Sequence, residues 1–195
     1  MQEERFEESG ISPALRKSSL MLRRFSWLNF WIQIILGLVA LLMTLFTVGR
    51  NVFGQGETGA PRAAGLTETS VLLFLSLAVQ IYMAFRAFQC VQTGRRLRQE
   101  DPNQRPRKGQ TIDFLWRTTL FTFGGLGLAI LSAQAVGGIL LGRSFASIGA
   151  PYSPALAVQV IEPLDIFLVL ANVHVITAHS LGLAITLFLL NRLDR

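Results

Sequence analysis

Four long apolar runs alternate with polar segments that contain Gly and Pro. They cover about residues 27–48, 69–91, 114–141 and 164–190. A helix that crosses the hydrocarbon core of a bilayer needs roughly 20 mainly apolar residues, so each run is long enough to span it. The pattern predicts an all-α polytopic membrane protein with four transmembrane helices. We expect one membrane domain, residues 27–192, behind an N-terminal tail.

Composition and charge support this class and suggest an orientation. The chain has 195 residues, of which 51% are hydrophobic and 15% are charged, whereas soluble proteins average about 25% charged residues. Five Lys/Arg precede the first run, six lie in residues 93–110 and two follow the last run, against three in the other two loops. The positive-inside rule therefore places both termini on the cytoplasmic side. The net charge of +6 reflects this topology, and we expect no nucleic-acid partner.

The N-terminal tail, residues 1–26, contains a helix-start signal. Ser12 is a suitable N-cap, and Pro13 fits the first helical position. The helix that follows is predicted to lie on an anionic leaflet before the first span, and the alternative is a disordered basic flank. The first apolar run is too long for the core of a secretory signal, and the acidic N-terminus does not fit a transit peptide. We therefore expect the first span to remain in the mature protein.

The fourth run carries polar residues at a spacing of seven. Seven residues are two helical turns less about 20°, so these residues form one stripe. The stripe consists of Asp165, Asn172, His179 and Thr186. A polar stripe in hydrocarbon needs partners, because unpaired polar groups there are costly.

Two interpretations of the stripe remain open. In the first, it forms a proton or metal pathway that Gln134 of the third run completes together with Gln33 or Gln80, and His179 and Asp165 are the candidate metal ligands. In the second, the same side chains hydrogen-bond across helices and lock the bundle, with Asp165 serving as a helix cap.

Other residues narrow the chemistry. His174 and His179 are five residues apart, about 140° around a helix, so they cannot share one ion. The single cysteine, Cys90, excludes a disulfide framework. The chain contains no catalytic sequence motif, so we expect neither an enzyme nor a bound cofactor.

Helix packing is predicted for the third run, which is dense in small residues. Its glycines permit close helix approach, which drives association in lipid. The candidates are Gly124, Gly127, Gly138 and Gly142. In the second run, Arg86 lies close enough to the end to extend its guanidinium to lipid headgroups.

Several motifs, in order and spacing over roughly residues 20–192, resemble one membrane-protein family. They are Trp27-Leu28-Asn29-Phe30-Trp31-Ile32-Gln33, Arg105-Pro106-Arg107-Lys108 with Thr111, Ala133-Gln134-Ala135-Val136-Gly137, Arg143-Ser144, Pro163-Leu164-Asp165-Ile166-Phe167, Ala171-Asn172, Ala178-His179 and Leu190-Asn191-Arg192. The chain is similar to a four-span family of unknown function found in cyanobacteria and plastids. Its chloroplast inner-envelope members are described both as a permease and as a translocon component.

The resemblance implies two competing functions. One is a permease or accessory protein that transports iron or another divalent metal. The other is a non-transporting subunit of a protein-import translocon or other membrane complex, and both imply a homo-oligomer or other membrane proteins as partners. The residues that match the family are Gln33, Gln134, Asp165, Asn172 and His179. At His174 the chain departs from the family pattern, which argues against this residue as a ligand. We expect a cyanobacterial protein of the plasma or thylakoid membrane.

Overall fold

The computed structural model describes residues 13–53, 66–99, 101, 105–147 and 163–194, and this part of the chain is all α. Its four helices are α2 (Pro13–Phe53), α3 (Leu66–Arg96), α4 (Lys108–Ser147) and α5 (Pro163–Asp194). Each is long and apolar enough to cross a membrane. The prediction of a four-span, multi-pass membrane protein is therefore confirmed, whereas the orientation of the termini stays a prediction.

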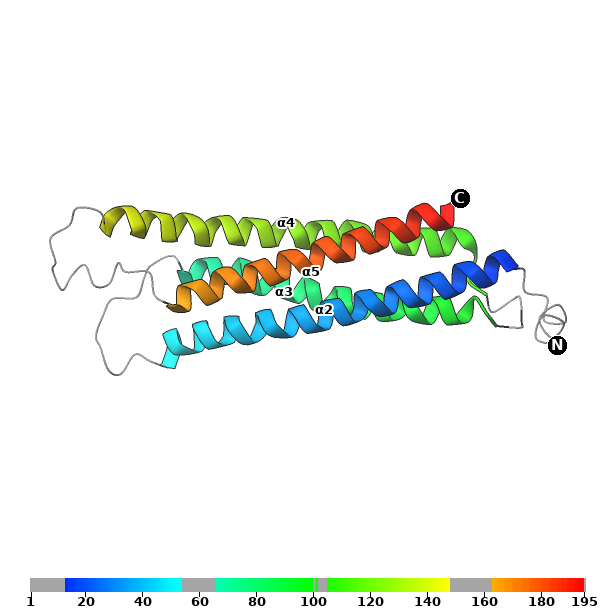
Figure 1. Ribbon diagram of the computed structural model, residues 1–195, viewed down its shortest axis with the longest axis horizontal. Helices are drawn as coiled ribbons and strands as arrows, with labels where there is room; N and C mark the ends of the chain where they lie inside the picture. Colours follow the sequence, from blue (N-terminus) through cyan, green and yellow to red (C-terminus); the bar gives the residue numbers. More distant parts are fainter. Residues whose placement is uncertain (1–12, 54–65, 100, 102–104, 148–162, 195) are drawn as a thin grey trace.

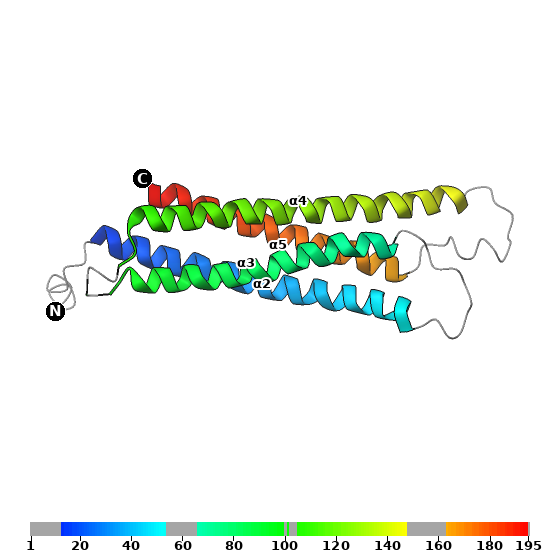
Figure 2. The same ribbon diagram turned by 180° about the vertical axis from the view of Figure 1, so that it is seen from behind.

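The four helices run side by side in an elongated bundle (Figures 1 and 2). Both α3 and α5 pack against α2 and α4, so neighbouring helices follow the order α2, α3, α4, α5 around the bundle. The start of α2 and the end of α5 lie at the same end, where the connection from α3 to α4 also lies (Figure 1). Successive helices therefore run antiparallel, as in an up-down-up-down four-helix bundle.

The segment predicted as a separate interfacial helix is instead the first part of α2. The helix begins at Pro13 and has 41 residues, or about 60 Å at the usual helical rise. Leu22 is fully buried in an apolar cluster, and the Ser19 hydroxyl donates to the Gly94 carbonyl at 2.7 Å. Because no helix breaker separates this segment from the first span, the bundle continues through it. Residues 1–12 of the predicted tail lie outside the described residues.

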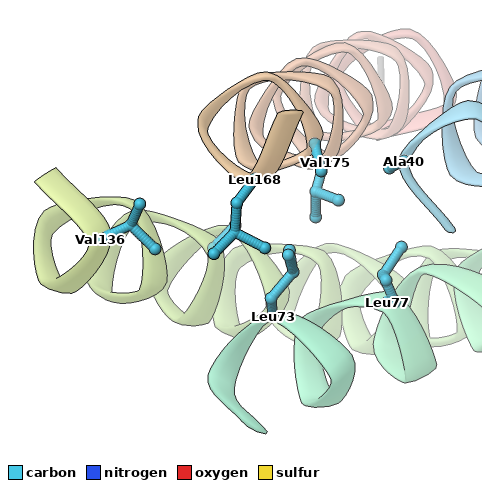
Figure 3. Close-up of a cluster of buried hydrophobic side chains, with 8 residues drawn as sticks. Ala40, Leu73, Leu77, Val136, Leu168 and Val175 are labelled. Atoms are coloured by element: carbon cyan, nitrogen blue, oxygen red, sulfur yellow. The ribbon is translucent and has the colours of Figure 1, made fainter. Parts of the chain in front are cut away.

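Two apolar clusters fill the bundle, one toward each end. The first joins all four helices, as Figure 3 shows for six of its members. It consists of Ala40, Leu73, Leu77, Ala129, Val136, Leu168, Ala171 and Val175. The second consists of Leu22, Cys90, Leu97, Leu115 and Leu189. On every helix, the stretch between the two clusters carries polar or glycine positions, and these meet at the centre of the bundle.

Candidate functional site

A layer of buried polar side chains lies at the centre of the bundle. His179 is the middle residue of the span Asp165–Leu193, and Gln33 lies next to the middle of the span Leu15–Gly49. Gln80 and Ser76 come from α3, and all four of these side chains are buried. We call these four residues the central polar layer. The central positions of His179 and Gln33 in their spans place this part of the layer in the most apolar part of a bilayer.

His179 is enclosed between α3 and α4. Its Nε2 lies 3.5 Å from the Ser76 Oγ, and the Ser76 hydroxyl donates to the Gly125 carbonyl at 3.2 Å. His179 is fully buried, and its Nδ1 has no hydrogen-bond partner. One ring nitrogen therefore serves a contact between helices, while the other is buried without a hydrogen-bond partner.

Two glycines make room for the layer. A Cβ at Gly125 would lie 2.6 Å from the His179 Cε1, and a Cβ at Gly182 would lie 2.6 Å from the Gln33 Nε2. Real Cβ contacts are essentially never this short, so any larger residue would displace the polar side chains. The sequence predictions did not single out these glycines. The spacing along α4 could have indicated that Gly125 is buried, because Gly125 lies on the same helix face as the buried residues Thr118 and Thr122.

The two glutamines join α2 to its neighbours through backbone carbonyls. The Gln33 Nε2 donates to the Ala178 carbonyl of α5 at 2.9 Å, and the Gln80 Nε2 donates to the Gln33 carbonyl at 3.1 Å. The Oε1 atoms of both glutamines have no hydrogen-bond partner. The amide nitrogens of both glutamines are therefore hydrogen-bonded, whereas their amide oxygens are not.

The outer part of the predicted stripe is separate from the layer. The Asn172 Nδ2 donates to the Leu168 carbonyl of its own helix at 2.9 Å, and its Oδ1 has no partner. Asp165 forms a salt bridge with Arg143 at 3.0 Å, which joins α5 to α4. Asp165 and His179 are about 21 Å apart along the helix. The two candidate metal ligands are thus not brought to one site, and no group of three or more His, Cys, Asp or Glu forms among the described residues.

Comparison with known proteins places this arrangement in a family. The model of a protein family of unknown function, DUF3611, matches residues 12–194. The chain belongs to the DUF3611 family. It is 27% identical over 190 residues to the protein TIC 21, chloroplastic, of Arabidopsis thaliana. The matched region covers 92% of this chain and 59% of that relative. The chain therefore spans about three fifths of the relative's length. No solved structure shows significant similarity to it.

In this DUF3611 protein, Gln134 does not complete the predicted pathway. It is exposed on α4, about 160° around the helix from the buried Ser132 and Val136. The family resemblance singled out a residue that the fold turns away from the bundle, because the buried face of α4 is set by the register of its small and apolar residues.

The four glycines predicted for packing also face outward from the DUF3611 bundle. A Cβ at Gly124, Gly127, Gly138 or Gly142 would meet nothing within 4 Å, and all four positions are exposed. These glycines therefore do not pack against other helices of the described bundle, and packing against another membrane protein stays a prediction. They share the exposed side of α4 with Gln134.

The guanidinium of Arg86 contacts α4 and does not extend to lipid headgroups as the sequence predicted. Its Nη2 donates to the Phe114 carbonyl at 3.0 Å and to the Thr118 hydroxyl, also at 3.0 Å, and its guanidinium lies 3.8 Å from the centre of the Phe114 ring. Two acceptors and an aromatic face on α4 replace the headgroups, so Arg86 fixes α3 to α4.

Proposed function

We propose that this protein is a non-enzymatic membrane subunit of a transport or translocation assembly, and that it acts beside other membrane proteins or further copies of itself. One observation carries the proposal: the buried amides of Gln33 and Gln80 are used for contacts between helices, whereas one face of α4 turns an amide and four glycines outward, namely Gln134, Gly124, Gly127, Gly138 and Gly142. The similarity to the chloroplastic TIC 21 protein supports this class of role.

The outward side of α4 is suited to a partner in the membrane. An amide in hydrocarbon is costly unless it is paired, and Gln134 is exposed within the span Lys108–Phe145. Gly127 and Gly138 lie within about 40° of Gln134 around the helix. Glycines allow another helix to approach closely, so a neighbouring helix would satisfy the amide and cover the glycines together.

Cross-linking from α4 in native membranes tests this proposal. A photoreactive cross-linker on the variant Gly138→Cys should capture a defined membrane protein or a second copy, with Cys90 replaced by Ser to remove the native thiol. The matched control is Val71→Cys on α3, which is also exposed and should give no specific product. If both positions capture the same set of proteins at random, α4 has no dedicated partner and the proposal fails.

A second candidate function, the transport of iron or another divalent metal, has one observation in its favour. Among the described residues, the buried polar atoms without a hydrogen-bond partner include side-chain atoms of Gln33, Gln80, Asn172 and His179. These atoms would line a polar route if the helices separated to admit water. Metal uptake into proteoliposomes should then fall strongly for His179→Ala and remain normal for Thr177→Ala, an exposed neighbour. The absence of uptake by the folded native protein would exclude this function.

The orientation is part of the same proposal. Both termini and the connection between α3 and α4 lie on the cytoplasmic side of a cyanobacterial plasma or thylakoid membrane. Residues 93–110, around the connection between α3 and α4, hold six of the 18 Lys and Arg, which supports this side. Labelling of single cysteines at exposed positions, Arg98 at that end and Phe145 at the other, with an impermeant reagent tests it. Labelling of the Arg98 end from outside would reverse the orientation.

A further inference from the structure

Two exposed arginines lie side by side where α2 and α3 pack together (Figure 2), at the end of the bundle that holds the start of α2. Arg23 comes seven residues before Phe30, and Arg95 comes seven residues after Phe88. The rings of Phe30 and Phe88 are in contact, with centroids 6.0 Å apart. A spacing of seven keeps two residues within about 20° around a helix, so both arginines lie on the side of this ring pair. A Cβ at Gly94 would be 3.1 Å from the Arg23 backbone nitrogen, so the two backbones are close here.

The arginine pair, Arg23 and Arg95, has no negative partner in the described part of the chain. Neither side chain makes a hydrogen bond or an ion pair with any residue there, whereas the exposed Arg117 is paired with Asp113 at 3.0 Å. Two neighbouring positive charges repel each other unless an anion joins them. Guanidinium groups bind phosphate through paired hydrogen bonds. The pair therefore fits an anionic group with several oxygens.

The depth of the arginine pair in the membrane favours a lipid as the source of that anion. Trp27 stacks on Phe30 with ring centroids 5.4 Å apart and is 42% exposed, and exposed tryptophans are typical of the membrane–water interface. Arg23 lies four residues, or about 6 Å, beyond Trp27. The headgroup region extends roughly 5–7 Å beyond the hydrocarbon core on each side. The arginines therefore lie at headgroup depth, next to exposed aromatic rings.

We propose that Arg23 and Arg95 bind the phosphate of an anionic phospholipid, whose glycerol backbone and upper acyl chains pack on Trp27 and Phe88. A soluble phosphate would match the charges but leave the exposed rings uncovered. A zwitterionic lipid would bring its own cation close to the two arginines. The site is independent of the proposed function, because the proposed partner surface lies on α4.

Quenching of tryptophan fluorescence by brominated lipids tests the site in the full-length protein. The chain has three tryptophans. Trp31→Phe with Trp116→Phe leaves Trp27, and Trp27→Phe with Trp31→Phe leaves Trp116, which is exposed on α4. Phosphatidylcholine vesicles carry either brominated phosphatidylglycerol or brominated phosphatidylcholine. Trp27 should report a preference for phosphatidylglycerol of about 25-fold, or about fivefold for each arginine, whereas Trp116 should report only the smaller preference that the general surface charge produces.

Charge-matched variants locate the preference. Arg23→Gln with Arg95→Gln should remove most of the preference at Trp27. Arg117→Gln with Arg192→Gln removes the same charge from exposed positions at the same end of the bundle and should leave that preference unchanged. All four side chains are exposed, so these substitutions do not alter the core, and quenching of Trp116 checks that the bundle is intact.

Four results would overturn the proposal. Equal preferences at Trp27 and Trp116 would reduce the effect to the general attraction between a basic surface and an anionic leaflet. A preference that survives Arg23→Gln with Arg95→Gln would place the lipid elsewhere. Loss of the preference on addition of inorganic phosphate at constant ionic strength would assign the arginines to a soluble anion. Cross-links from Arg95→Cys to one protein in native membranes, unaffected by added phosphatidylglycerol, would make this surface a protein-docking site.

Discussion

The tight fit between Gly125 and His179 gives the sharpest test of the central polar layer. In Gly125→Ala, the new Cβ would lie 2.6 Å from the His179 Cε1 and 2.8 Å from the Val79 Cγ1. The imidazole is fully buried, so relief requires a shift of the ring or of a helix. Overpacking of this kind costs about 1–3 kcal/mol.

The neighbouring glycine provides a matched control. Gly124→Ala adds the same methyl group one residue earlier, where it meets nothing within 4 Å. Both substitutions carry the same gain in helix propensity, about 0.5–1 kcal/mol relative to Gly. The difference between them therefore isolates the steric cost, and Gly125→Ala should be less stable than Gly124→Ala by about 1–3 kcal/mol.

Unfolding in mixed micelles, followed by circular dichroism, measures this difference. A double variant adds a second check, because Gly125→Ala with His179→Ala should lose most of the steric cost, which gives a coupling energy of similar size. Equal stability of the Gly125→Ala and Gly124→Ala proteins would refute the reasoning, since it would mean that the layer has free space around the imidazole.

Three further predictions concern contacts between helices, and the same unfolding assay measures them. Asp165→Ala should lower the free energy of unfolding by about 3 kcal/mol, because it leaves the largely buried Arg143 without its carboxylate. If Asp165→Ala lowers the free energy of unfolding equally in the native protein and in an Arg143→Ala background, the two side chains are not coupled. Arg86→Met should lower the free energy of unfolding by about 2 kcal/mol, because it removes the charged hydrogen bonds to α4. Arg95→Met, at an exposed position, should change the free energy of unfolding by less than about 0.5 kcal/mol. Similar losses in both variants would show that the positive charge, and not the hydrogen bonds, is responsible. Gln33→Leu should cost about 1 kcal/mol for the bond to the Ala178 carbonyl, and an unchanged stability would show that this bond has no net value.

The fold was predictable because long apolar runs in a chain with few charges have essentially one solution in a bilayer. The buried polar residues were partly predictable for the same reason. A stripe at a spacing of seven must share a face of its helix, and Asp165, Asn172, His179 and Thr186 are indeed all buried. The sequence does not show which face of each of the other helices points into the bundle.

The faces of α4 show why. Polar and small residues occur all around this helix, so periodicity alone does not separate its buried face from its lipid face. Gln134 and Gly138 look like interior residues by type, yet they are exposed, whereas Gly125 faces His179. The choice depends on which rotation of α4 accommodates the imidazole of α5, and that is a property of the pair of helices rather than of either sequence segment.

The same contacts bear on whether the bundle can conduct. Lipid supplies no hydrophobic force between helices, so polar bonds and close packing must fix their register. Gln33 and Gln80 do this at the centre by donating to backbone carbonyls of neighbouring helices. A polar route through the centre would have to break these bonds and admit water to the acceptor atoms left over. Locking and conduction are therefore alternatives within one arrangement of the helices. Transport requires a second arrangement in which α2 separates from α3 and α5, whereas a partner role uses the surface of α4 as it already stands.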